Sequence, residues 1–158
     1  MKLSQLPARV VTGAYIFHSG MQKWGGDEET AAALHGMASG AYPFLQRMEP
    51  ARFLQLLAAG EMAVGAALAV PLVPERTAGK LLTGFAAGLM GLYFRTPGMR
   101  EEGSIWPTQQ GIALAKDVWL LGIGLNLLLS SAGSDRDRAR EATEAIEATG
   151  EVVEAVTD

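Results

Sequence analysis

The sequence contains no cysteine, and only two of its 158 residues are histidine, His18 and His35. The absence of cysteine excludes disulfides, thiol redox chemistry, covalent c-type haem attachment and thiolate-bound zinc or iron–sulfur centres. Two histidines are too few for a multi-histidine metal centre, so no metal site is predicted. Charged residues are also scarce, at 19% of the chain, whereas 49% of it is hydrophobic.

The net charge of −4 is concentrated at the C-terminus. Residues 132–158 hold eight acidic residues against three arginines, whereas the remainder holds nine acids against ten bases. No basic stripe or recognition motif is present in the sequence, so a nucleic-acid partner is not expected. Residues 132–158 are predicted to form an acidic cytoplasmic tail, disordered or weakly helical.

Four long apolar segments precede the tail, at residues 6–24, 53–73, 78–94 and 111–130. Each is close to the roughly 20 residues that cross a hydrocarbon core about 30 Å thick. The last three have no wide polar stripe, as is typical of helices that are apolar nearly all round. The sequence therefore predicts an all-α fold in which residues 1–131 form an integral membrane antiparallel four-helix bundle.

The connection at residues 25–51 is too long for a plain turn. Asp27 is placed to act as a helix N-cap, with Glu28 and Glu29 in the first turn that follows. A short amphipathic helical segment is therefore predicted outside the membrane between the first two spans, and Pro43 is predicted to begin a further turn. In the third span, Gly84 and Gly88 form a GxxxG pair that is predicted to let helices pack closely.

Basic residues predict the orientation of the spans. With the N-terminus inside, the inner segments hold seven lysines and arginines and the outer segments five, so both termini are predicted to be cytoplasmic. The aromatic residues are more asymmetric, because seven of the eleven fall at or beyond the predicted outer ends. These seven are Trp24, Tyr42, Phe44, Phe53, Tyr93, Phe94 and Trp106. The outer mouth of the bundle is thus the end predicted to be specialised.

Ionisable side chains from three segments are predicted to share one depth. At about 1.5 Å per helical residue, His18, Glu61 and the adjacent Lys116 and Asp117 lie roughly 9–12 Å below the outer surface. A charge in hydrocarbon is costly, so Lys116 is expected to be neutralised by Glu61 or Asp117, with His18 or water completing the hydrogen bonds. Adjacent helical residues point about 100° apart, so Asp117 is expected to face inward and Lys116 to extend toward the interface.

Two interpretations of this charged layer are open. It is either a ligand or proton site, as intramembrane ionisable groups often are, or a structural ionic lock that fixes the helix register. Lys23 and Arg9 lie at span ends and are predicted to be interfacial anchors.

Three stretches resemble DoxX-family membrane proteins across about residues 5–130. ARVVTGAYIFHSGMQK, with Arg9, Gly13, Gly20 and Lys23, resembles the first helix of the family. Glu61 and Gly65 in LAAGEMAVGAAL resemble the glutamate and glycine of its second helix. Lys116 and Asp117 in IALAKDVWLLG resemble the final-helix signature of actinobacterial-type members.

The resemblance implies a multi-pass protein of the bacterial plasma membrane that serves as a membrane subunit of oxidoreductase assemblies. Relatives are linked to thiosulfate:quinone oxidoreduction and to defence against oxidative stress. Without cysteine, such activity would need a protein partner or a quinone. The first hypothesis is therefore a pocket for a quinone-like headgroup in the outer half of the bundle, with no catalytic residue assigned and independent catalysis not expected. Its ligand-binding candidates are His18, Glu61, Lys116 and Asp117, with Tyr93 and Trp119 flanking the ring.

The second hypothesis is a non-catalytic accessory or scaffold subunit of a larger respiratory membrane complex. In that case the buried charges are the structural lock, and the glycine faces or the acidic tail dock the partner. A transporter is disfavoured, because four unbroken helices offer little machinery for alternating access.

Overall fold

The computed structural model describes the backbone of residues 3–157 and the side-chain surroundings of residues 3–144 and 146. This described part of the chain is mostly α-helical and has no β-strand. In chain order its helices are η1 (Leu3–Gln5), α1 (Leu6–Trp24), α2 (Glu28–Ala41), η2 (Pro43–Arg47), α3 (Pro50–Ala69), α4 (Glu75–Arg95), α5 (Ile112–Ala115) and α6 (Val118–Thr157).

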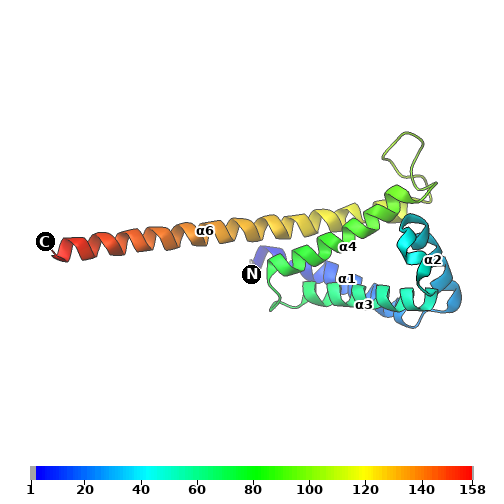
Figure 1. The fold of residues 1–158 in the computed structure, drawn as a ribbon, viewed down its shortest axis with the longest axis horizontal. Helices are drawn as coiled ribbons and strands as arrows, with labels where there is room; N and C mark the ends of the chain where they lie inside the picture. The colour runs from blue at the N-terminus through cyan, green and yellow to red at the C-terminus, as the bar shows by residue number, and fades with distance from the viewer. Residues whose placement is uncertain (1–2, 158) are drawn as a thin grey trace.

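The long helices form two pairs, α1 with α3 and α4 with α6. The pairs lie close together near the turn that joins α3 to α4, and they diverge toward the end that carries α2 (Figure 1). The buried core is shared by both pairs and consists of Ile16, Val64, Leu68, Ala78, Leu82 and Leu127. The molecule is therefore wedge-shaped, with its core toward the narrow end.

Glycine sets the close approach of the helices within each pair. A Cβ placed on Gly65 would lie 2.5 Å from the backbone nitrogen of Phe17 and 2.6 Å from the carbonyl oxygen of Gly13. In the other pair, a Cβ on Gly124 would lie 2.8 Å from the backbone nitrogen of Thr83. Small residues that let backbones touch in this way are the usual means of packing helices where lipid supplies no hydrophobic drive.

The predicted packing motif in α4 makes no close helix contact with the described residues. A Cβ on Gly84 or on Gly88 would meet nothing within 4 Å. The prediction that this GxxxG pair packs against a neighbouring helix is therefore wrong for the isolated chain. The reason is the rotation of α4, which turns Gly79 and Thr83 toward α6 and leaves the Gly84–Gly88 face outward.

Two helices are long and apolar enough to cross a membrane, Pro50–Ala69 and Ile112–Glu144. The first runs from Pro50 to Ala69, so both of its ends lie a few residues earlier than those of the predicted span 53–73. Pro50 opens α3, and the helix ends shortly before Pro71, where the turn begins. Across the described residues, α1 and α4 do not reach the same standard of length and hydropathy. Crossing by all four segments thus stays a prediction.

The connection between α1 and α3 contains the predicted short helix. Asp27 caps α2 by accepting a hydrogen bond of 2.9 Å from the backbone N–H of Thr30, which lowers the pKa of the Asp27 carboxyl. The buried face of α2 is made of Ala31, Ala38 and Ala41. The turn at Pro43 is also present, as η2. α2 and η2 close the wide end of the wedge (Figure 1).

The C-terminal tail, for which disorder and a weak helix were the two alternatives, is helical as far as Thr157. α6 continues from the apolar segment through the acidic residues for 40 residues and extends well beyond the other helices (Figure 1). Two causes act together. The tail is rich in alanine, glutamate and arginine, which favour helix, and the preceding apolar turns have already nucleated the helix.

Arg9 is not an interfacial anchor, as was predicted, but is fully buried. Its Nε donates to the carbonyl oxygen of Leu68 at 3.0 Å, and its Nη2 donates at 3.1 Å to three further carbonyls, those of Ala67, Val70 and Val73. These carbonyls belong to the C-terminal end of α3 and the turn after it. A cation is favourable there because the last carbonyls of a helix have no internal partner and carry partial negative charge.

Candidate functional site

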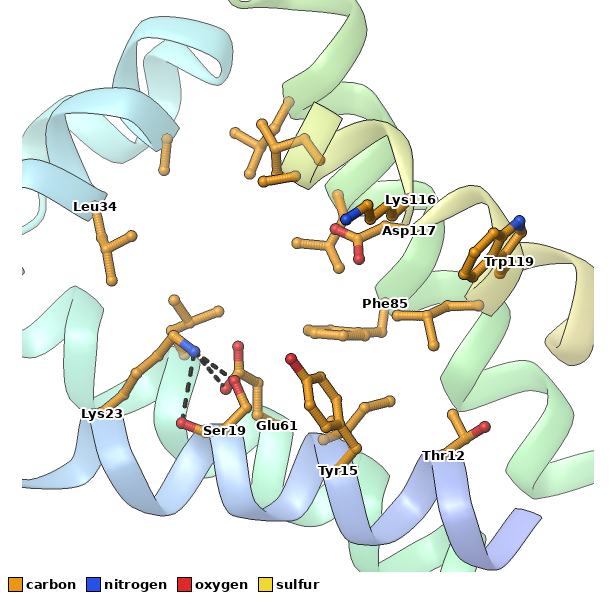
Figure 2. A pocket seen from close by; sticks show the side chains of 18 of the residues that line it. Thr12, Tyr15, Ser19, Lys23, Leu34, Glu61, Phe85, Lys116, Asp117 and Trp119 are labelled. Carbon is orange, nitrogen blue, oxygen red and sulfur yellow. Dashed lines mark hydrogen bonds and ion pairs between the residues drawn. The ribbon is translucent and has the colours of Figure 1, made fainter. Parts of the chain in front are cut away.

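A cavity of about 650 Å³ lies between the two helix pairs at the wide end of the wedge. α1, α2, α3, α4, α5 and α6 all contribute to its wall, which is mainly apolar (Figure 2). Its hydroxyl-bearing and charged side chains are Thr12, Tyr15, Ser19, Lys23, Glu61, Lys116 and Asp117. This volume and lining are typical of a site for a small organic molecule.

α1 presents a polar stripe to the cavity. Thr12, Tyr15, Ser19 and Lys23 follow one another at intervals of three, four and four residues, which places them on one helix face. Figure 2 shows the Tyr15 hydroxyl pointing into the cavity, where it makes no hydrogen bond to any described residue. The stripe therefore supplies a row of groups that can donate or accept hydrogen bonds.

Glu61 is paired with Lys23, which differs from the predicted pairing with Lys116. The Lys23 ammonium lies 2.9 Å from Glu61 Oε2, and it also donates to Ser19 Oγ at 2.7 Å and to the Ser19 carbonyl at 3.5 Å. The Glu61 side chain is 7% exposed and that of Lys23 is 22% exposed. The prediction that Lys23 is an interfacial anchor is thus wrong, because α1 and α3 pack closely enough for its stem to reach Glu61 (Figure 2).

Lys116 and Asp117 lie on the wall opposite Glu61, and both line the cavity (Figure 2). They form the turn between α5 and α6, where the Asp117 N–H bonds to the Leu114 carbonyl and the Trp119 N–H bonds to the Lys116 carbonyl, each at 3.1 Å. These are three-residue steps, tighter than those of an α-helix. The expectation that only Asp117 faces inward, which assumed a continuous helix, is therefore wrong.

The Lys116 ammonium makes no ion pair or hydrogen bond with the described residues. Its neutralisation by Glu61 or Asp117 is thus not seen. The tight turn at Lys116 and Asp117 interrupts the regular helix between α5 and α6. A break that places polar groups beside a cavity is where membrane proteins tolerate irregular backbone.

The other predicted site residues separate into two groups. Trp119 lines the cavity, although 72% of its surface is exposed. His18 is exposed on another face of α1 and does not reach the cavity. Tyr93 is buried, but its hydroxyl donates to the Ile105 carbonyl at 2.7 Å and the residue is not part of the cavity wall. Neither residue reaches the cavity, because depth along a helix does not fix the face on which a side chain lies.

Sequence reasoning missed Tyr15 and Ser19. Ser19 could have been found from its position four residues before Lys23, since such residues are neighbours on a helix surface. Tyr15 could have been found from the same stripe.

The charged side chains of the cavity lie on two opposite walls. Each wall carries one acid and one base, Lys23 and Glu61 facing Lys116 and Asp117, so the charges balance locally. In the described part of the chain, no three His, Asp or Glu side chains are grouped as a metal site would need. What the arrangement offers is hydrogen-bond donors at one end of an apolar chamber.

Comparisons with protein-family models, with curated proteins and with solved structures give no match. The DoxX resemblance thus rests on the residues that carry it and stays a prediction.

Proposed function

We propose that this chain is a multi-pass protein of a bacterial plasma membrane in which α1, α3, α4 and the α5–α6 segment cross the bilayer with both termini in the cytoplasm. This proposal is supported by the exposed apolar surface of the long helices. In the most apolar stretch of Pro50–Ala69 only 33% of the residues are buried, and in that of Ile112–Glu144 only 11% are. A core helix of a soluble protein would be mostly buried, so these helices need an apolar surrounding. α1 adds exposed Val11 and Phe17.

The topology is tested by labelling, for which the lack of native cysteine is convenient. A Glu102→Cys variant is expected to react with a membrane-impermeant maleimide on intact cells, because the loop 96–111 is proposed to lie outside. An Asp137→Cys variant in α6 is expected to react only after lysis. Labelling of Asp137→Cys in intact cells, as readily as Glu102→Cys, would contradict the proposed orientation.

We further propose that the protein is the membrane subunit of an oxidoreductase-type assembly and binds a quinone-like small molecule in the cavity, without catalysing a reaction alone. The observation that carries this is the cavity itself, where the Lys23–Glu61 pair faces Lys116 and Asp117 across an apolar chamber. A quinone head needs donors for its two carbonyls, and lysine and tyrosine supply them from opposite walls. The DoxX resemblance points to the same class of ligand.

Glu61→Gln is expected to weaken binding of menaquinone or ubiquinone to the purified protein about tenfold, which corresponds to 1.4 kcal/mol. Loss of the negative charge breaks the ion pair between Glu61 and Lys23 and changes the position of the Lys23 ammonium in the cavity wall. Binding would be measured in nanodiscs doped with the quinone. Glu102→Gln, in the outer loop and away from the cavity, is the matched control and should bind as the unaltered protein does. If no quinone binds, or if both variants bind alike, the proposal fails.

The alternative, a scaffold subunit of a respiratory complex, is favoured by one observation. The ion pair of Lys23 and Glu61 joins α1 to α3 directly, as a structural lock would. On this alternative Glu61→Gln lowers stability by about 1–3 kcal/mol, the usual loss of a charge-assisted hydrogen bond, without any quinone effect. A stoichiometric large partner recovered from native membranes in mild detergent would favour it.

A further inference from the structure

The cavity opens sideways, between α1 and the start of α6. Val11, Tyr15 and Trp119 all line the cavity, yet they are 70%, 75% and 72% exposed. A side chain can line a cavity and also be largely exposed only where it lies at the rim of an opening. Figure 2 places Tyr15 and Trp119 on helices that face each other across this gap. If the apolar helices cross a bilayer, this opening faces the acyl chains rather than water.

The charged side chains of the cavity gather at one of its ends, among apolar neighbours such as Leu34 and Leu57. Ser19, Lys23, Glu61, Lys116 and Asp117 lie toward the end covered by α2. The opposite end is lined mainly by apolar side chains, with Thr12 its polar member: Val11, Ile16, Phe85, Leu120 and Ile123. From Lys23 to Val11 the α1 wall is about 18 Å long, at about 1.5 Å per residue. The chamber thus matches a molecule with one polar head and one apolar tail.

The two lysines at the polar end are not equivalent. An ammonium group has three N–H donors. Those of Lys23 are directed at Glu61 Oε2, Ser19 Oγ and the Ser19 carbonyl, so Lys23 has no donor to spare. Lys116 faces the same space and has no such partner among the described residues. A ligand head that needs a cation or a donor therefore finds it in Lys116.

From these contacts we infer that the ligand reaches the cavity laterally from the bilayer, between Tyr15 and Trp119, and that Lys116 binds an oxygen on its head. The inference rests on the proposed function and specifies its ligand as a single-tailed lipid-soluble molecule with a hydrogen-bond-accepting oxygen. Asp117 beside Lys116 disfavours a doubly charged head, since like charges repel at short range. A quinone carbonyl and a fatty-acid carboxylate share the required chemistry.

Trp119 provides the measurement, because it lies at the rim. In a Trp24→Phe, Trp106→Phe background, Trp119 is the one remaining tryptophan. The full-length protein in nanodiscs is titrated with decylubiquinone in one arm and a dibrominated stearic acid in the other, both of which quench indole fluorescence. We expect saturable quenching, with the arm of lower Kd identifying a neutral or an anionic head.

Lys116→Ala in this background is expected to raise the Kd about tenfold or more, as for loss of one charge-assisted hydrogen bond. Lys116→Arg, which keeps charge and donors, should stay within about threefold. Lys80→Ala, an exposed lysine of α4 away from the cavity, is the matched control and should leave the Kd unchanged. Circular dichroism of each variant reports whether it is folded.

Three results would overturn the inference, and they are distinguishable. Equal Kd values for Lys116→Ala and Lys80→Ala would show that Lys116 does not bind the head, while the proposed quinone function stands. Quenching of Trp119 that never saturates, with quinone binding still measured by another method, would place the opening elsewhere. Absence of binding in both arms would remove the proposed function together with the inference.

Discussion

Gly65→Val is expected to separate α1 from α3 and to lower the free energy of unfolding by about 3 kcal/mol, the upper range for overpacking. The added methyl groups would meet backbone atoms of Phe17 and Gly13, starting from a Cβ only 2.5 Å from the nearest of them. Backbone cannot rotate away as a flexible side chain can, so the helices must move apart. The loss would be measured by unfolding in mixed micelles with increasing SDS, followed by circular dichroism.

Gly60→Val is the matched control, since the same change on the same helix meets nothing within 4 Å. It should cost only the small difference in helix propensity between the two residues. Gly65→Ala should lie between the two. If Gly60→Val and Gly65→Val unfold at the same SDS fraction, the close α1–α3 contact is not a feature of the folded protein.

Arg9→Gln is expected to cost about 4 kcal/mol, because four carbonyl oxygens lose a charged donor in a buried place. An unsatisfied buried polar group costs about 1–3 kcal/mol, and the shorter glutamine can satisfy at most a part of the four. α3 should also fray at its C-terminal end, which amide hydrogen exchange at Ala69 and Val70 would detect.

Arg76→Gln is the comparison for this second variant. Arg76 is largely exposed, and its contact to Asp135 is 3.9 Å, so its loss should change stability by less than about 1 kcal/mol. Arg9→Lys keeps the charge but not the branched donor geometry and should recover a part of the loss. An Arg9→Gln variant as stable as Arg76→Gln would mean that Arg9 does not cap α3.

Local signals in the sequence predicted several elements well. α1 begins at Leu6 and ends at Trp24, as expected from the apolar segment. Asp27 caps α2 as predicted, because the side chain of an aspartate just before a helix can accept a hydrogen bond from a backbone N–H of the first turn. Such features depend on residues within one or two turns of each other, and these are adjacent in the sequence.

The predictions that failed depend on the rotation and spacing of packed helices. Glu61, Lys116 and Asp117, which were expected to share one depth, all line one cavity. Depth did not reveal that His18 points away or that the Tyr93 hydroxyl bonds to the carbonyl of Ile105, in the loop after α4. An error of one residue turns a side chain by about 100°, so no count along the chain could decide which face is inward.

By itself, the sequence determined that this protein is helical, rich in apolar segments and free of thiol chemistry, because composition and periodicity are properties of the chain alone. Only the tertiary structure decided which charges meet. Gly13 and Gly65 bring α1 so close to α3 that Lys23 forms an ion pair with Glu61. Lys116 then has no partner among the described residues and faces the cavity. The physical reason is that an ion pair forms over a few ångströms, and helix packing sets those distances.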